Sequence, residues 1–287
     1  SDEFKNNNRI IGGGISVDST TAINNGSIQA IDEIGIDSHT FDNNGLVYTN
    51  DAIALTTGAM NNQATIHANI VNISGGAIKN SGTIFGQDKV DASVVIIDNL
   101  ADGIIQSSQS LDLNASLLLS NKGRILSNGW SGLSGDTIFN RGHIQSVSMN
   151  ITGGTVSNSG DMLAGGELNV SGLNIFNANE ALMQSKSVTD VNGNFVSNKG
   201  SIVSGEQLNV VAHEITNSGR LQSNQDMSLN AETSLFAGSI ENTGQIITGE
   251  SLLIETNKYE NSGTQFSDGK TTMSIHGGCL KYEEIFF

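Results

Sequence analysis

An asparagine recurs about every 19 residues along the chain, and in most copies a glycine follows it two residues later. The copies begin at residues 24, 43, 61, 80, 99, 121, 140, 158, 177, 198, 217, 242 and 261. Self-similarity at a fixed short period is typical of solenoids, in which each repeat buries its apolar face only by stacking on its neighbours. The repeat therefore constrains the fold more than any other feature of the chain.

The apolar residues follow the same period. One apolar side chain stands two residues before each asparagine, as Ile78 does, and another stands two residues after most of the glycines, as Ile202 does. A third set alternates with period two, as in Leu208 and Val210. Period-two alternation rich in β-branched residues predicts short strands, and no segment keeps the 3.6-residue period of a helix.

In three copies of the repeat, the position two residues after the glycine lacks a large apolar side chain. Thr65 and Gln265 occupy it with polar side chains, although Ile66 and Phe266 come directly after them. A one-residue bulge in each copy would restore the apolar face. Ala181 fills the same position only weakly.

These patterns predict an all-β fold, a single-stranded right-handed parallel β-helix (β-solenoid) of about 13 coils with a period of about 19 residues. Proline is absent, as expected of a continuous ladder that uses every backbone N–H. Residues 1–20 precede the repeat and are interpreted as an N-terminal lead-in or cap. Residues 21–276 form the β-helix, and residues 277–287 are a C-terminal cap or the start of a truncated further domain.

The recurring asparagine suits a turn, because its side chain bonds to nearby backbone and tolerates positive φ. Stacked in successive coils, the amides can also hydrogen-bond to one another. We therefore predict a structural turn ladder formed by Asn24, Asn43, Asn61, Asn80, Asn121, Asn140, Asn158, Asn177, Asn198, Asn217, Asn242 and Asn261.

Charge and cysteine content exclude several classes of function. With 13 Lys and Arg against 29 Asp and Glu, the net charge is −16, which argues against binding nucleic acid or an anionic membrane surface. No apolar run approaches the roughly 18 residues of a membrane-spanning helix. The single cysteine, Cys279, cannot form an internal disulfide or a cysteine-based zinc site. We expect no cofactor and no membrane insertion, and we expect a monomer.

Two features are candidate partner contacts. Acidic residues recur six or seven positions after the glycine, and Glu206, Asp226 and Glu250 come from three consecutive coils. This corner could hold Ca²⁺, meet a basic partner, or consist of solvated turn residues. Trp130, the only tryptophan, could be a binding contact or simply cover the strand face. The histidines are isolated from one another in sequence, and we assign no catalytic or metal-binding residue.

The segment NKGSIVSGEQLNV, residues 198–210, resembles the haemagglutinin repeats of large two-partner-secreted exoproteins. These include filamentous haemagglutinin adhesins and the effectors of contact-dependent growth inhibition. Residues 158–170 follow the same pattern, and the resemblance covers roughly residues 20–276. It implies a Gram-negative secreted or cell-surface protein with an outer-membrane export partner and a receptor on a target cell.

The sequence thus favours a non-enzymatic, structural or adhesive stalk segment that presents or contacts a target-cell receptor, in adhesion or in contact-dependent toxin delivery. The alternative is a carbohydrate-active β-helix enzyme, a polysaccharide lyase or hydrolase. Such enzymes need long loops or a groove with clustered carboxylates. Long loops are scarce here, because only the interval from Asn217 to Asn242 adds as many as six residues to the period. A calcium-stabilised module is a third possibility.

Overall fold

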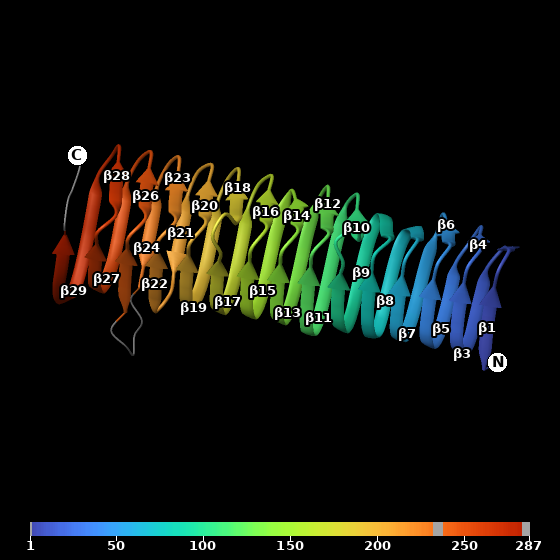
Figure 1. Cartoon of the computed structure of the whole chain (residues 1–287). Coiled ribbons are helices and arrows are strands. Elements are labelled where there is room, and N and C mark those ends of the chain that lie inside the picture. Colours follow the sequence, from blue (N-terminus) through green and yellow to red (C-terminus); the bar gives the residue numbers. More distant parts are fainter. Residues whose placement is uncertain (1, 232–237, 283–287) are drawn as a thin grey trace. The chain divides into compact units, whose positions relative to one another are not determined.

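The computed structural model describes residues 2–231 and 238–282, and within them it contains 29 strands and no helix. The chain is a β-solenoid of about 14 parallel turns with a period of about 19 residues, which confirms the predicted fold class (Figure 1). No helix in the described part of the chain could cross a membrane. The chain divides into two compact units, Ser1–Val147 and Ser148–Phe287, which are described separately.

In the first unit, each full turn has a short strand followed by a long one. The short strands are β2 (Arg9–Gly12), β4 (Ser27–Ala30), β6 (Leu46–Thr49), β10 (Ile104–Ser107), β12 (Arg124–Ser127) and β14 (His143–Ser146). The long strands are β3 (Ile15–Asn24), β5 (Ile34–Asn43), β7 (Ala52–Asn62), β11 (Ser110–Asn121) and β13 (Trp130–Asn140). The short and long segments are continuous in β8 (Thr65–Asn80) and β9 (Thr83–Asn99), and β1 (Glu3–Asn6) precedes them all.

The second unit repeats this plan. Its short strands are β16 (Asp161–Ala164), β18 (Leu182–Ser185), β20 (Ser201–Ser204), β23 (Arg220–Ser223), β26 (Gln245–Thr248) and β28 (Thr264–Ser267). Its long strands are β15 (Ser148–Asn158), β17 (Leu168–Asn177), β19 (Thr189–Asn198), β27 (Leu252–Asn261) and β29 (Thr271–Tyr282). In two turns the long strand is divided, into β21 (Leu208–Val211) and β22 (Glu214–Asn217), and into β24 (Met227–Asn230) and β25 (Ser239–Asn242).

Each turn thus contributes to three faces. We call them the short-strand face, the middle face formed by the first half of each long strand, and the asparagine face formed by its second half. Within each unit, successive turns pair in parallel strand by strand, so that Asn24 lies beside Asn43 and Asn198 beside Asn217. Residues 3–12 already join this register, because Asn6 of β1 pairs with Asn24 of β3. At the other end, the backbone of residues 277–282 continues β29, and residues 283–287 lie outside the described residues.

The core consists of the apolar side chains that the period-two pattern directs inward. In the short-strand row of the first unit, Ile28, Val47, Ile66 and Ile84 are all at most 1% exposed. The same row in the second unit contains Met162, Met183 and Ile202, each fully buried. Since each buried aliphatic side chain contributes about 1.5–3 kcal/mol relative to its exposed state, this continuous apolar column is the main stabilising element in each unit.

The third asparagine of the predicted ladder is displaced by one residue. Asn43 pairs with Asn62, and Asn62 pairs with Asn80, so Asn61 is not the residue in register. Met60 is accordingly buried, whereas Ala59 is exposed. Counting from Asn62 also places Ile66 inward without the bulge that the sequence suggested.

The other two irregular copies resolve differently. Gln265 points inward and stays buried, because its side-chain carbonyl accepts a 2.7 Å hydrogen bond from the buried Tyr259 hydroxyl. Phe266 points outward and is 41% exposed, so the proposed bulge is wrong there too. In the copy that begins at Asn177, Met183 rather than Ala181 takes the core position between Met162 and Ile202. This copy is longer than the usual 19 residues, and its turn contains Glu180, which has a φ of 65°.

Candidate functional site

The asparagines of the first unit form a continuous hydrogen-bonded row in its interior. Each Nδ2 donates to the Oδ1 of the next asparagine at 2.8 Å, and each asparagine is at most 5% exposed. The second amide proton bonds to backbone, as when Asn24 donates to the carbonyl of Leu46 at 3.1 Å. The members are Asn6, Asn24, Asn43, Asn62, Asn80, Asn99, Asn121 and Asn140. Asn6 and Asn99 were not assigned to the ladder from the sequence.

The predicted member Asn61 lies outside this row. It is half-buried on the opposite side of the strand, and its Nδ2 lies 3.4 Å from an oxygen of Asp42. The dipeptide Asn61-Asn62 offered two candidates, and the first was chosen by its spacing from Asn43. The buried Met60 and Ile66 identify Asn62 instead.

The second unit has its own row, in which each Nδ2 again donates to the Oδ1 of the asparagine in the next turn. The distances between successive amides run from 2.6 to 3.0 Å. A glycine after each asparagine is required by packing in several turns: a Cβ on Gly219 would lie 2.0 Å from the carbonyl oxygen of Gly200 in the preceding turn. The members are Asn158, Asn177, Asn198, Asn217, Asn242 and Asn261.

The predicted acidic corner lies at the turns between the short-strand face and the middle face. Glu206 and Glu250 are exposed, and Glu206 accepts a 3.3 Å hydrogen bond from Ser187. Asp226 is half-buried, and its carboxylate accepts a 3.0 Å bond from the backbone N–H of Ser251. No group of three or more His, Cys, Asp or Glu in the described part of the chain is arranged to hold a metal ion. The three acids therefore occupy successive turns without converging on one point.

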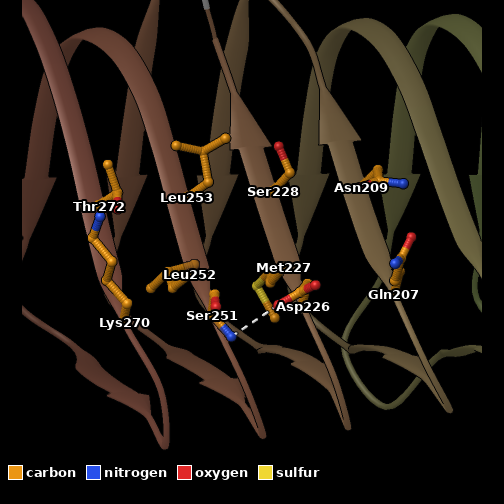
Figure 2. A pocket seen from close by; sticks show the side chains of 10 residues that line it. All are labelled: Gln207, Asn209, Asp226, Met227, Ser228, Ser251, Leu252, Leu253, Lys270 and Thr272. Atoms are coloured by element: carbon orange, nitrogen blue, oxygen red, sulfur yellow. Dashed lines mark hydrogen bonds between the residues drawn. The ribbon is translucent and has the colours of Figure 1, made fainter.

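Asp226 also lines a shallow, open hollow of about 450 Å³ on the middle face of the second unit (Figure 2). The hollow crosses β21, β24, β27 and β29. It is lined by Gln207, Asn209, Asp226, Met227, Ser228, Ser251, Leu252, Leu253, Lys270 and Thr272.

The hollow follows from the sizes of side chains in one outward row. Ser228 pairs with Asn209 on one side and with Leu253 on the other, so a short side chain lies between two longer ones. Leu253 is the apolar member of this outward row and is half-buried. Around it lie amide, hydroxyl, carboxylate and ammonium groups. This combination of one apolar contact and several hydrogen-bonding groups suits non-covalent recognition of a ligand or partner.

An aromatic column on the short-strand face of the first unit was not predicted. The rings of Tyr48 and His67 are 5.2 Å apart between centroids, and those of His67 and Phe85 are 4.8 Å apart, both in edge-to-face geometry. Burial lowers the pKa of His67. The signal was present in the sequence, because the three residues share one outward position of the repeat in successive turns.

The other predicted contact, Trp130, begins β13 on the middle face of the first unit and is 41% exposed. Trp130 belongs to the first unit, whereas Glu206, Asp226 and Glu250 belong to the second. Comparison of the chain with family models, curated proteins and solved structures gives no match.

Proposed function

We propose that this chain is a structural and adhesive β-solenoid segment of a secreted bacterial surface exoprotein, which presents or contacts a receptor on a target cell. The observation that carries the proposal is the uniformity of the turns. Buried apolar positions and a buried asparagine recur from turn to turn, and the outward side chains are mostly polar. Such a turn can be repeated to extend a scaffold, and its outward side chains can vary without disturbing the core.

The resemblance of residues 198–210 to haemagglutinin repeats adds a location and partners to this proposal. On that basis we propose a Gram-negative cell-surface or secreted protein, exported by an outer-membrane partner and acting in adhesion or contact-dependent toxin delivery. The segment acts without catalysis or cofactor, as a monomer, and binds neither nucleic acid nor membrane. The net charge of −16 supports the exclusion of nucleic acid.

The hollow on the middle face of the second unit is the proposed contact surface. Leu253 lies among polar groups, as the anchor of a protein interface does. The short Ser228 beside it leaves room for a partner side chain to reach the leucine. Asp226 is held by the backbone N–H of Ser251, so its position is fixed before binding.

Binding of the fluorescently tagged full chain to Gram-negative bacteria and cultured epithelial cells tests the proposal. We expect saturable binding to at least one cell type, displaced by the untagged chain and weakened at least about tenfold by Leu253→Glu. Leu163→Glu is the matched control, because Leu163 is also a half-buried outward leucine of the second unit but lies on the short-strand face. Absence of saturable binding to every cell type would contradict the proposal, as would turnover of a polysaccharide by the purified chain.

A further inference from the structure

The only tryptophan of the chain lies flat on the surface of the first unit. A Cβ placed on Gly132 would lie 2.3 Å from Cη2 and 2.8 Å from Cζ2 of Trp130. The six-membered part of the indole therefore lies directly over Gly132, which is itself buried. Residues i and i+2 of a strand share one face, so glycine at this position is what allows the ring to lie down. The indole keeps 41% of the residue's surface in contact with solvent.

Polar side chains of the neighbouring strand border this ring. In the register of β11 and β13, Ser110 pairs with Trp130, Asp112 with Gly132 and Asn114 with Ser134. Neighbouring strands are about 4.8 Å apart, so Asp112 is the residue of the preceding turn next to Gly132, which the ring covers. Within the described residues this carboxyl has no hydrogen-bond partner.

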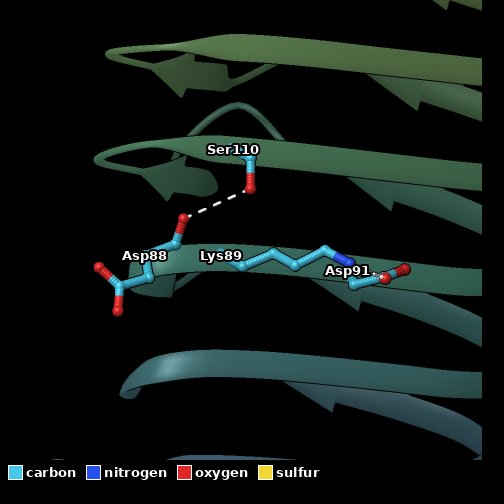
Figure 3. A network of polar contacts seen from close by, with 4 residues as sticks. All are labelled: Asp88, Lys89, Asp91 and Ser110. Atoms are coloured by element: carbon cyan, nitrogen blue, oxygen red, sulfur yellow. Dashed lines mark hydrogen bonds and ion pairs between the residues drawn. The ribbon is translucent and has the colours of Figure 1, made fainter.

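The next strand provides a cation, and that cation is already paired. Lys89 of β9 contacts the Asp91 carboxylate at 2.5 Å, and Ser110 donates to the backbone carbonyl of Asp88 at 3.4 Å (Figure 3). Asp91 is in register with Asp112. Burial, with a smaller effect of Asp91, raises the pKa of Asp112, and the Lys89 ammonium opposes this rise. Asp112 is thus a half-buried acceptor beside an open aromatic face, with no ion-pair partner of its own among the described residues.

We propose that Trp130, supported by Gly132 and bordered by Asp112 and Asn114, is a binding site for a neutral saccharide. A pyranose ring has an apolar C–H face and a rim of hydroxyl groups. The C–H face stacks on the indole and removes apolar surface from water on both sides. The hydroxyls donate to the Asp112 carboxylate, which forms stronger hydrogen bonds than a neutral acceptor does, and they exchange hydrogen bonds with the exposed Asn114 amide.

The surroundings favour a saccharide over a cation. A cation over the indole is the other ligand that this ring could attract. The Lys89 ammonium pairs with the Asp91 carboxylate and also acts on Asp112, so it partly compensates the negative charge that would attract a cation to this ring. A neutral saccharide can hydrogen-bond to the Asp112 carboxylate and the Asn114 amide. A quaternary ammonium group has no N–H or O–H with which to do so. This inference is independent of the proposed receptor contact, which lies in the other unit.

The single tryptophan makes the test specific, because the indole fluorescence of the full chain reports this site alone. The chain is titrated with cellohexaose and with chitohexaose, and in parallel with choline chloride. We expect a saturable shift in emission with at least one hexasaccharide and reduced quenching by acrylamide. A saturable shift with choline alone would overturn the proposal in favour of a cation site. No shift with any of the three would overturn it as well.

Three variants locate the binding, each measured by calorimetry at the same saccharide concentrations. Gly132→Ala forces the ring off the surface, and we expect at least a tenfold loss of affinity. Gly35→Ala is its matched control on the middle face, since a Cβ there meets nothing within 4 Å. Asp112→Ala should weaken binding while Asp112→Asn, which keeps an acceptor, restores part of it. Unchanged affinity in the folded Gly132→Ala chain would overturn the proposal.

Discussion

Two rows place side chains at one position of successive turns: the buried asparagines in each unit, and the acidic corner of Glu206, Asp226 and Glu250 in the second unit. In the asparagine row, consecutive amides lie 2.6–3.0 Å apart and are almost inaccessible to solvent. In the acidic corner, Glu206 and Glu250 are exposed, and their neighbour Asp226 bonds to a backbone N–H rather than to another side chain. The same stacking therefore produces an ordered row in one place and separated side chains in the other.

The difference lies in the chemistry of the two groups. A carboxamide both donates and accepts, so identical copies satisfy one another along the row. An ionised carboxylate only accepts, and like charges at the spacing of neighbouring turns repel by about 1 kcal/mol in water and more in the interior. Repetition thus stabilises the asparagines and keeps the acids at the surface. The following predictions either break this contrast or refine it.

Asn62→Asp places a carboxylate in the buried row and should have the largest effect. The new carboxylate could accept from Asn43 but could not donate to Asn80, and an uncompensated buried charge costs about 3–5 kcal/mol. Burial should raise the pKa of this carboxyl above its unfolded value. The loss of stability should then be complete at neutral pH and shrink as the pH falls toward about 4. Urea unfolding at pH 7 and pH 4 measures both effects, and an equal loss at both values would contradict this explanation.

Asn62→Ala removes the amide without adding charge. It leaves the Nδ2 of Asn43 and the Oδ1 of Asn80 without their partners, which should cost about 2–3 kcal/mol of unfolding free energy. Asn61→Ala is the matched control and should change stability by less than about 0.5 kcal/mol, because this half-buried side chain lies outside the row. The reverse order of the two effects would show that the register is set by Asn61.

Asp226→Ala removes the carboxylate of the acidic corner that accepts a hydrogen bond from the backbone N–H of Ser251. We expect a loss of about 0.5–1.5 kcal/mol, typical of one partly exposed hydrogen bond. Glu206→Gln and Glu250→Gln should each change stability by less than about 0.5 kcal/mol. Thermal unfolding with and without calcium chloride measures all three. A calcium-dependent rise in Tm that is lost in these variants would instead indicate a cation site at the corner.

Asp112→Asn should have a small effect of the opposite sign. The folded-state pKa of Asp112 is raised, so its ionised form destabilises the fold above that pKa, and this cost disappears below the unfolded value of about 3.9. Solvent screening keeps the cost small, so the variant should be more stable by less than about 1 kcal/mol at pH 7. The gain should vanish near pH 3 in urea unfolding, and a gain that persists there would have another cause.

The sequence predicted the fold class because period, alternation and the recurring asparagine all agree. It did not show which residue of Asn61-Asn62 belongs to the buried row, because both lie within one position of the expected spacing. Nor did it place Asn6, whose copy lacks the glycine two residues later. The position of Gln265 depended on a specific partner, the Tyr259 hydroxyl, which no pattern of hydrophobicity reveals.

The candidate sites were less predictable than the fold. The hollow depends on Ser228 lying beside Leu253, and these residues are in register only across the longest interval of the repeat. The flat position of Trp130 depends on Gly132, which the sequence shows, but also on Asp112 in the preceding turn, which only the register places beside it. In a solenoid, the surface is determined by residues about 19 positions apart, and each small insertion changes which ones meet.

Exchange of the asparagine side-chain amide protons tests the central claim most directly. Nuclear magnetic resonance of the chain labelled with nitrogen-15 asparagine resolves these protons, and Asn62→Ala and Asn61→Ala assign the two residues at the disputed position. We predict that the amide protons of Asn62 exchange with solvent far more slowly than those of Asn61, as buried and hydrogen-bonded groups do. Equally rapid exchange of both would show that the buried asparagine row does not exist.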